Sequence, residues 1–112
     1  MEVQKEIKKE AFCVKCTVKH KGEIAGRAFL YILYNDLHVE PFALLEDLFV
    51  QEEHRGKGIG KELVQAAIAE AKSQGCYKLI FTARNSKPET QAWYKRLGFK
   101  EWGKEFRFDF QN

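Results

Sequence analysis

The pattern of hydrophobic and polar residues predicts strands in the first half of the chain. Apolar residues there recur at every second position, as in a half-buried strand, or run nearly continuously, as in a strand buried on both faces. The predicted strands are Ala11–His20, Ile24–Tyr34 and Phe42–Val50. Residues 1–10 are rich in Lys and Glu, and they fit either a short strand or an arm.

A helical period follows the third strand. Apolar residues at helical spacing form one stripe and predict a helix over roughly Ile59–Ser73, which ends near Gly75. The stripe comprises Leu63, Val64, Ala67, Ile68 and Ala71. The next apolar run, Tyr77–Ala83, predicts a buried strand. Because a helix joins it to Phe42–Val50, the two strands are expected to be parallel, in a right-handed crossover.

The last third of the chain predicts one more helix and two closing strands. Ser86-Lys87-Pro88-Glu89 has the form of a capping box with an early proline, so a helix is expected to run to about Leu97 and stop at Gly98. The closing strands are Phe99–Trp102 and Glu105–Phe110. The whole pattern predicts an α+β (mixed α/β) fold in a single domain, residues 1–112, with a mixed sheet whose N-terminal strands are antiparallel.

Composition agrees with one packed domain and narrows the partners. The chain has 112 residues, of which 45% are hydrophobic, enough for one core. Its net charge of +3 comes from interspersed acids and bases, and the basic spot formed by Lys15, Lys19, His20 and Lys21 is expected to face water at a sheet edge. We therefore expect no nucleic-acid partner. No apolar run reaches the ~20 residues of a membrane span, so we expect no membrane partner and a cytoplasmic location.

The three cysteines do not suggest metal or disulfide chemistry. Cys13 and Cys16 form a C-x-x-C pattern, but they lie within a clean period-two alternation. Strand geometry then points them to opposite faces, which is wrong for a shared metal or a disulfide. We expect no metal site and three free thiols.

The segment from Gln51 to Gly60, Gln-Glu-Glu-His-Arg-Gly-Lys-Gly-Ile-Gly, joins the third strand to the first helix. Its glycines allow a tight turn that exposes backbone N–H groups beside the positive end of the helix dipole, an arrangement that binds phosphate. A P-loop is excluded because Glu62 follows Lys61, and the dinucleotide fingerprint fails on spacing. The pattern that remains is Arg55-x-x-Gly58-x-Gly60.

This pattern, between a strand and a helix, resembles the pyrophosphate-binding motif of the GCN5-related N-acetyltransferase (GNAT) family, which holds acetyl-coenzyme A. The segment Trp93–Phe99 resembles the second family motif, an aromatic pair on a helix that closes on Leu-Gly-Phe. The segment Leu45–Val50 resembles the same strand in the diamine and polyamine acetyltransferase branch.

The resemblance implies roles for individual residues. It places Tyr94 near the coenzyme A sulfur as general acid, and it makes Glu46 a water-mediated base, in preference to its neighbour Asp47. It places the pantetheine arm along the strand before the loop, the pyrophosphate on the loop, and Asn85 near the pantetheine or the acceptor. The implied cofactor-binding residues are Leu48, Phe49, Val50, Arg55, Gly56, Lys57, Gly58, Ile59, Gly60, Lys61 and Asn85.

The resemblance therefore predicts an N-acetyltransferase that moves an acetyl group from acetyl-CoA to a primary amine. The acceptor is a small cationic amine, a polyamine, or a lysine or N-terminal amine. The alternative is a non-catalytic acyl-CoA-binding or regulatory module on the same fold. Only about ten residues precede the first strand, so the helices that usually cover the acceptor side are expected to be missing or reduced. The apolar surface left exposed would favour a homodimer.

Overall fold

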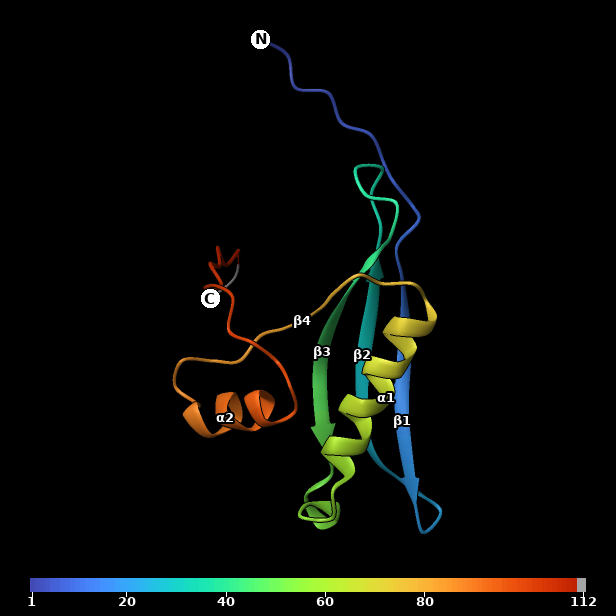
Figure 1. Ribbon diagram of the computed structural model, residues 1–112, viewed down its shortest axis with the longest axis vertical. Helices are drawn as coiled ribbons and strands as arrows, with labels where there is room; N and C mark the ends of the chain where they lie inside the picture. Colours follow the sequence, from blue (N-terminus) through green and yellow to red (C-terminus); the bar gives the residue numbers. More distant parts are fainter. Residues whose placement is uncertain (111–112) are drawn as a thin grey trace. The chain divides into compact units, whose positions relative to one another are not determined.

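Four strands in the order β1-β2-β3-β4 form a mixed sheet with one helix across a face. The computed structural model describes residues 1–110, and they form two compact units, Met1–Phe81 and the residues from Thr82 onward. The elements of the first unit, shown in Figure 1, are β1 (Phe12–His20), β2 (Glu23–Leu33), β3 (Phe42–Val50), a short 3-10 turn η1 (Glu52–His54), α1 (Ile59–Ser73) and β4 (Leu79–Phe81). The second unit contains α2 (Pro88–Arg96).

The connectivity confirms the predicted fold class. β1 pairs antiparallel with β2, and β2 pairs antiparallel with β3. β3 then pairs parallel with β4 after the crossover through α1. Alternation along β1 also holds, because Cys13 is opposite Tyr31 whereas Cys16 is opposite Ala28, so the two thiols project from opposite faces.

The core lies between α1 and one face of the sheet. Alternate residues of β2 and β3 and one stripe of α1 are buried, as the two periodicities require. The largest fully buried side chains are Leu30, Leu45, Leu63 and Val64. Gly26 on β2 lies against α1. A Cβ built there would lie 3.0 Å from Leu63 Cδ1 and 3.0 Å from the main-chain oxygen of Phe49.

The predicted strand Tyr77–Ala83 and the predicted second helix differ from the structure at their ends. β4 has three residues, Leu79–Phe81, and is shorter than the predicted strand. The predicted capping box is wrong, because α2 begins at Pro88 with Lys87 as its N-cap and has no side-chain cap. Proline favours the first helical position, which makes the residue directly before it the N-cap and leaves Ser86 in the preceding turn.

The two closing strands, Phe99–Trp102 and Glu105–Phe110, do not form within the described residues. The alternating aromatic residues of this segment are strongly exposed, namely Trp102, Phe106, Phe108 and Phe110. Alternation predicts which residues share a strand face, but a strand also needs an edge with which to pair. The sequence pattern contained no information about that edge.

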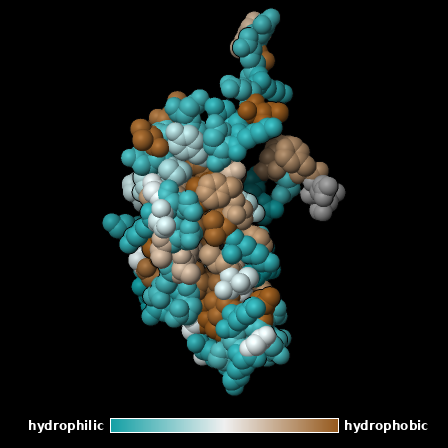
Figure 2. Space-filling model, turned by 90° about the vertical axis from the view of Figure 1, so that its right-hand side faces the viewer, coloured by the Kyte–Doolittle hydropathy of each residue, from teal (hydrophilic) through white to brown (hydrophobic). Residues whose placement is uncertain are grey.

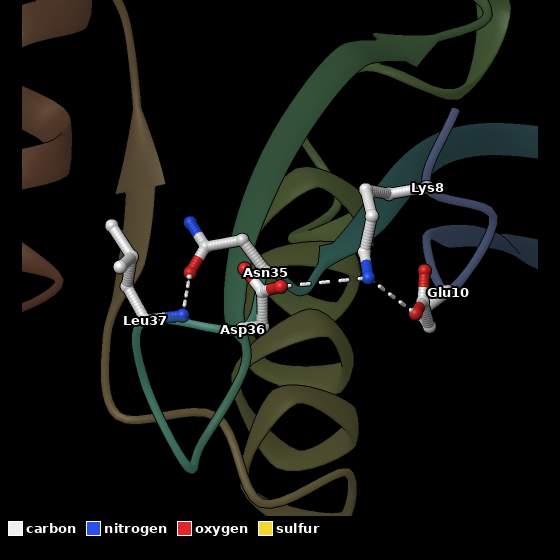
Figure 3. A network of polar contacts seen from close by, with 5 residues as sticks. All are labelled: Lys8, Glu10, Asn35, Asp36 and Leu37. Carbon is white, nitrogen blue, oxygen red and sulfur yellow. Dashed lines mark hydrogen bonds and ion pairs between the residues drawn. The ribbon is translucent and has the colours of Figure 1, made fainter. Parts of the chain in front are cut away.

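Residues 1–11 form neither a helix nor a strand. Lys8 Nζ lies 3.5 Å from Glu10 and 3.6 Å from Asp36, and Figure 3 shows it between these carboxylates. The carboxylates raise the pKa of Lys8. In Figure 2 the arm carries hydrophobic positions among hydrophilic ones, and Met1, Val3 and Ile7 are exposed.

The turn after β2 is closed by a side chain. The Leu37 N–H donates to Asn35 Oδ1 at 2.9 Å, which is an Asx turn (Figure 3). Neither α1 nor α2 is long and apolar enough to cross a membrane.

Gly26→Ala is expected to lower the free energy of unfolding by about 1–3 kcal/mol. The added methyl would lie 3.0 Å from the main-chain oxygen of Phe49, which is closer than normal van der Waals contact. Urea unfolding followed by circular dichroism measures this change. Gly103→Ala is the matched control, since a Cβ there meets nothing within 4 Å. Equal stability of the two variants would contradict the close approach of α1 to the sheet.

Candidate functional site

The loop after β3 has the backbone geometry of an anion cradle. Gly56 and Gly58 have φ of 78° and 82°, a region that favours glycine. Gly58 is the N-cap of α1, and the Glu62 N–H donates to the Gly58 oxygen at 3.1 Å, which closes the first helical turn. The N–H groups of residues 59–61 therefore have no intrahelical acceptor and lie at the positive end of the helix dipole. Gly60 is helical, so only two of the three glycines shape the turn.

Three exposed cations surround this cradle, namely Arg55, Lys57 and Lys61. The Arg55 side chain is held against β3, since its Nε donates to the Val50 oxygen at 3.0 Å and its guanidinium lies 5.5 Å from the centre of the Phe49 ring. Lys57 Nζ lies 3.5 Å from the Glu53 oxygen. The cradle thus combines exposed amides, a helix terminus and full positive charges, as pyrophosphate requires.

A buried histidine anchors the loop to the β1–β2 hairpin. His54 is 7% exposed, and its Nε2 lies 3.2 Å from Glu23 Oε2. Its ring meets the His20 ring edge-on, with centroids 5.5 Å apart. In the described structure the buried Nδ1 has no hydrogen-bond partner. The sequence signal for His54 is its place between the apolar strand and the glycines.

β3 contains a bulge that changes how its two acidic residues are placed. Asp47 has a φ of 54°, and the register with β2 shifts between the pairs Phe29–Glu46 and Arg27–Phe49. Arg27 Nη1 donates to the main-chain oxygen of Asp47. A regular strand would point the neighbours Glu46 and Asp47 to opposite faces, but alternation is interrupted at this position. Glu46 is half-buried and Asp47 is exposed.

The bulge also coincides with the end of the parallel ladder. β3 pairs with β4 only over Ala43, Leu44 and Leu45, and no ladder pair follows within residues 1–110. Leu48, Phe49 and Val50 therefore extend beyond β4 and lead directly into the glycine loop. A strand edge of this kind is a site where an extended ligand can pair with the backbone.

Glu46 and Phe49 share the face of the sheet opposite α1. Gly26 faces α1, as its contact with Leu63 shows, so its neighbour Arg27 faces away from the helix. The register puts Phe49 opposite Arg27 and Glu46 opposite Phe29, on that same face. The only α-helix of residues 1–81 lies on the other side of the sheet (Figure 1).

Tyr94 and Asn85 belong to the second unit. Tyr94 lies on α2, is 5% exposed and packs edge-on against the rings of Trp93 and Phe99, with centroid distances of 4.9 and 5.6 Å. Burial raises the pKa of its hydroxyl well above the usual value. Asn85 is exposed in the turn before α2. Their roles stay predictions.

The chain is similar to acetyltransferases both in sequence and in structure. The chain is 34% identical over 65 residues to the glucosamine 6-phosphate N-acetyltransferase of Trypanosoma brucei brucei, a match that covers 58% of this chain and 42% of that protein. A solved structure of a putative acetyltransferase from Agrobacterium tumefaciens superposes with a TM-score of 0.81 and 26% identity, over 87% of this chain and 68% of the other.

A second solved structure, glucosamine-6-phosphate N-acetyltransferase from Arabidopsis thaliana, superposes with a TM-score of 0.79 and 25% identity, over 88% of this chain and 67% of the other. The chain thus spans less than half of the curated relative from Trypanosoma but about two thirds of each solved structure. The family model described as "Acetyltransferase (GNAT) family" matches residues 1–99, and this chain belongs to that family.

Proposed function

We propose that this chain is an acetyl-CoA-dependent N-acetyltransferase that acts on a primary amine. The observation that carries the proposal is the cradle at the start of α1, which directly follows the stretch of β3 that has no ladder pair with β4. Acetyl-CoA supplies the activated acyl group as a thioester. Residues of this chain would bind the cosubstrate, accept the proton of the amine and stabilise the departing thiolate.

The loop fits a pyrophosphate group. A Cβ built on Gly56 or Gly58 would meet nothing within 4 Å, so the space outside the loop is open. The amides of Gly56–Lys61 and the side chains of Arg55, Lys57 and Lys61 would hold the diphosphate. The backbone of Leu48, Phe49 and Val50 would hold the pantetheine arm, with Asn85 as a further contact. The positive charges around this loop complement the negative charge of the cosubstrate.

Glu46 is the proposed base. An amine with a pKa near 10.4 is almost wholly protonated at pH 7, and freeing its lone pair costs about 4–5 kcal/mol. Glu46 would accept that proton through a water molecule. Its half-buried position on the face of the sheet opposite α1 supports this role. Asp47, in contrast, is exposed and lies in the bulge itself.

Tyr94 is the proposed partner of the departing thiolate. Because burial raises the pKa of its hydroxyl, Tyr94 stays protonated at neutral pH. It also gives up its proton less readily than an exposed tyrosine does. Donation of a hydrogen bond to the charge that develops on sulfur suits such a group better than complete proton transfer.

Several acceptor classes fit this proposal. A cationic amine, a polyamine and a protein amine all fit the chemistry. The substrate named for the Trypanosoma relative adds a phosphorylated amino sugar to these candidates. The proposal also includes a homodimer and a cytoplasmic location, the former supported by exposed Phe106, Phe108 and Phe110.

One observation favours the second candidate function, a non-catalytic acyl-CoA-binding module. Tyr94 is 5% exposed and packs between two aromatic rings, as a structural tyrosine would. Both candidates require the cradle, but only the transferase requires the Glu46 carboxylate and the Tyr94 hydroxyl.

Gly58→Val is expected to weaken acetyl-CoA binding by about tenfold or more, because a β-branched side chain is strained at this φ and projects into the phosphate space. Isothermal titration calorimetry measures the affinity. Gly22→Val is the matched control, since Gly22 has a similar φ of 80° and equally open surroundings in the β1–β2 turn. Absence of binding by the folded wild-type protein would exclude both candidate functions.

Tyr94→Phe is expected to lower kcat by about 100-fold, because the hydroxyl that stabilises the leaving thiolate is lost. The affinity for acetyl-CoA should change little, since the ring and its packing are retained. Steady-state kinetics and calorimetry on the same preparation separate the two quantities. Unchanged kcat would assign Tyr94 to the core and remove it from the mechanism, whereas absence of turnover by the wild-type protein would favour the binding module.

Glu46→Gln is expected to lower kcat/KM for the amine by about 100-fold near pH 7, because the base is removed. The loss should shrink as the pH rises toward the pKa of the amine, where the free amine no longer needs a base. Asp47→Asn is the matched control. A larger loss in Asp47→Asn than in Glu46→Gln would transfer the role to Asp47.

A further inference from the structure

A continuous row of cations and aromatic rings crosses the face of the sheet opposite α1. Lys15 Nζ lies 5.5 Å from the centre of the Phe29 ring, and the Arg27 guanidinium lies 5.9 Å from the same centre. Arg27 also lies 5.3 Å from the Phe49 ring, whose other cationic neighbour is Arg55 at 5.5 Å. The row therefore runs from β1 across β2 and β3 to the phosphate cradle.

The positive charges of this row are held by rings and main-chain oxygens. Arg27 donates to the Asp47 oxygen and Arg55 to the Val50 oxygen, while Lys15 is over a ring. Contacts of this kind orient a cation and leave its charge in place. Lys15 is exposed and Arg27 is half-buried, so both side chains are accessible to a small ligand.

The proposed base lies on the same face and next to this row. Glu46 is opposite Phe29, and Arg27 is two residues from Phe29 along β2. Residues at this spacing lie about 6–7 Å apart on one face of a strand. A negative group suited to an amine and a positive group suited to an anion therefore lie within the length of one small molecule.

Given the proposed acetyl transfer, we infer that the acceptor is a small zwitterion, an amine joined by a short spacer to a phosphate or carboxylate. Its amine lies toward Glu46, and its anionic group is bound by Arg27, with Lys15 adding longer-range attraction. The planar guanidinium donates two parallel hydrogen bonds to such groups, which makes Arg27 the principal residue. A polyamine would bring a second positive charge against this row and is disfavoured.

Calorimetry tests the inference without requiring turnover. Phosphoethanolamine and β-alanine are titrated into the full chain saturated with coenzyme A, beside ethanolamine and putrescine, which have no anionic group. We expect at least one of the first pair to bind at least tenfold more tightly than either of the second. Arg27→Gln should abolish that preference, because a hydrogen-bonded charge pair corresponds to about tenfold or more in affinity.

Matched variants show whether the charge or the planar guanidinium of Arg27 causes the preference for anionic amines. Arg27→Lys should retain part of the preference, since it keeps the charge and loses the fork. Lys72→Gln removes one positive charge from the last turn of α1 and should change nothing. The affinity of each variant for acetyl-CoA should equal that of the wild type. If Arg27→Gln also lowered the affinity for acetyl-CoA, the row would bind the cosubstrate's own phosphates. That result would overturn the inference.

The remaining outcomes are also decisive. Equal or tighter binding of putrescine would overturn the zwitterion and leave the transferase proposal standing. Preferential binding of an anionic amine without its acetylation would support the site and count against the transferase. If phosphoethanolamine alone is preferred, the anion is phosphate, and if β-alanine alone is preferred, it is carboxylate.

Discussion

The candidate site depends on the point at which β3 separates from β4. The two strands share a ladder over three residue pairs, and β3 then continues to Val50. The bulge at Asp47 lies two residues after Leu45, the last β3 residue of that ladder. Had the ladder continued, the backbone of Leu48–Val50 would be fully paired inside a sheet, and no extended ligand could lie beside it. The interrupted ladder leaves this part of the strand available as one wall of the candidate site.

Close packing on the opposite face determines where that wall leads. Gly26 allows Ile59 and Leu63 to lie against β2, which brings the first turn of α1 beside the end of β3. His54 and Glu23 then join the intervening loop to the hairpin. The cradle is thus supported by the core on one side and by a polar contact on the other.

Much of this arrangement could be predicted from the sequence because it follows local rules. Periodicity located the strands of the first unit and the helix, and glycine spacing located the cradle. The bulge escaped prediction, although two adjacent acids in an apolar strand were a visible irregularity, and aspartate adopts the left-handed region more readily than most residues. The register shift depends on the neighbouring strand, which no local pattern describes. The same reason explains why the alternation of Phe106, Phe108 and Phe110 predicted a strand without its partner. The cation–aromatic row was equally inaccessible, since it joins residues from three strands.

The support beneath the glycine loop has a thermodynamic consequence. A loop that folds together with the core has already lost its conformational freedom before any ligand arrives. Little of the interaction energy with a diphosphate is then spent on ordering the protein, and more of it appears as affinity. Recognition of this kind is closer to a preformed receptor than to an induced fit, so association would be governed by diffusion and electrostatic attraction instead of a slow rearrangement.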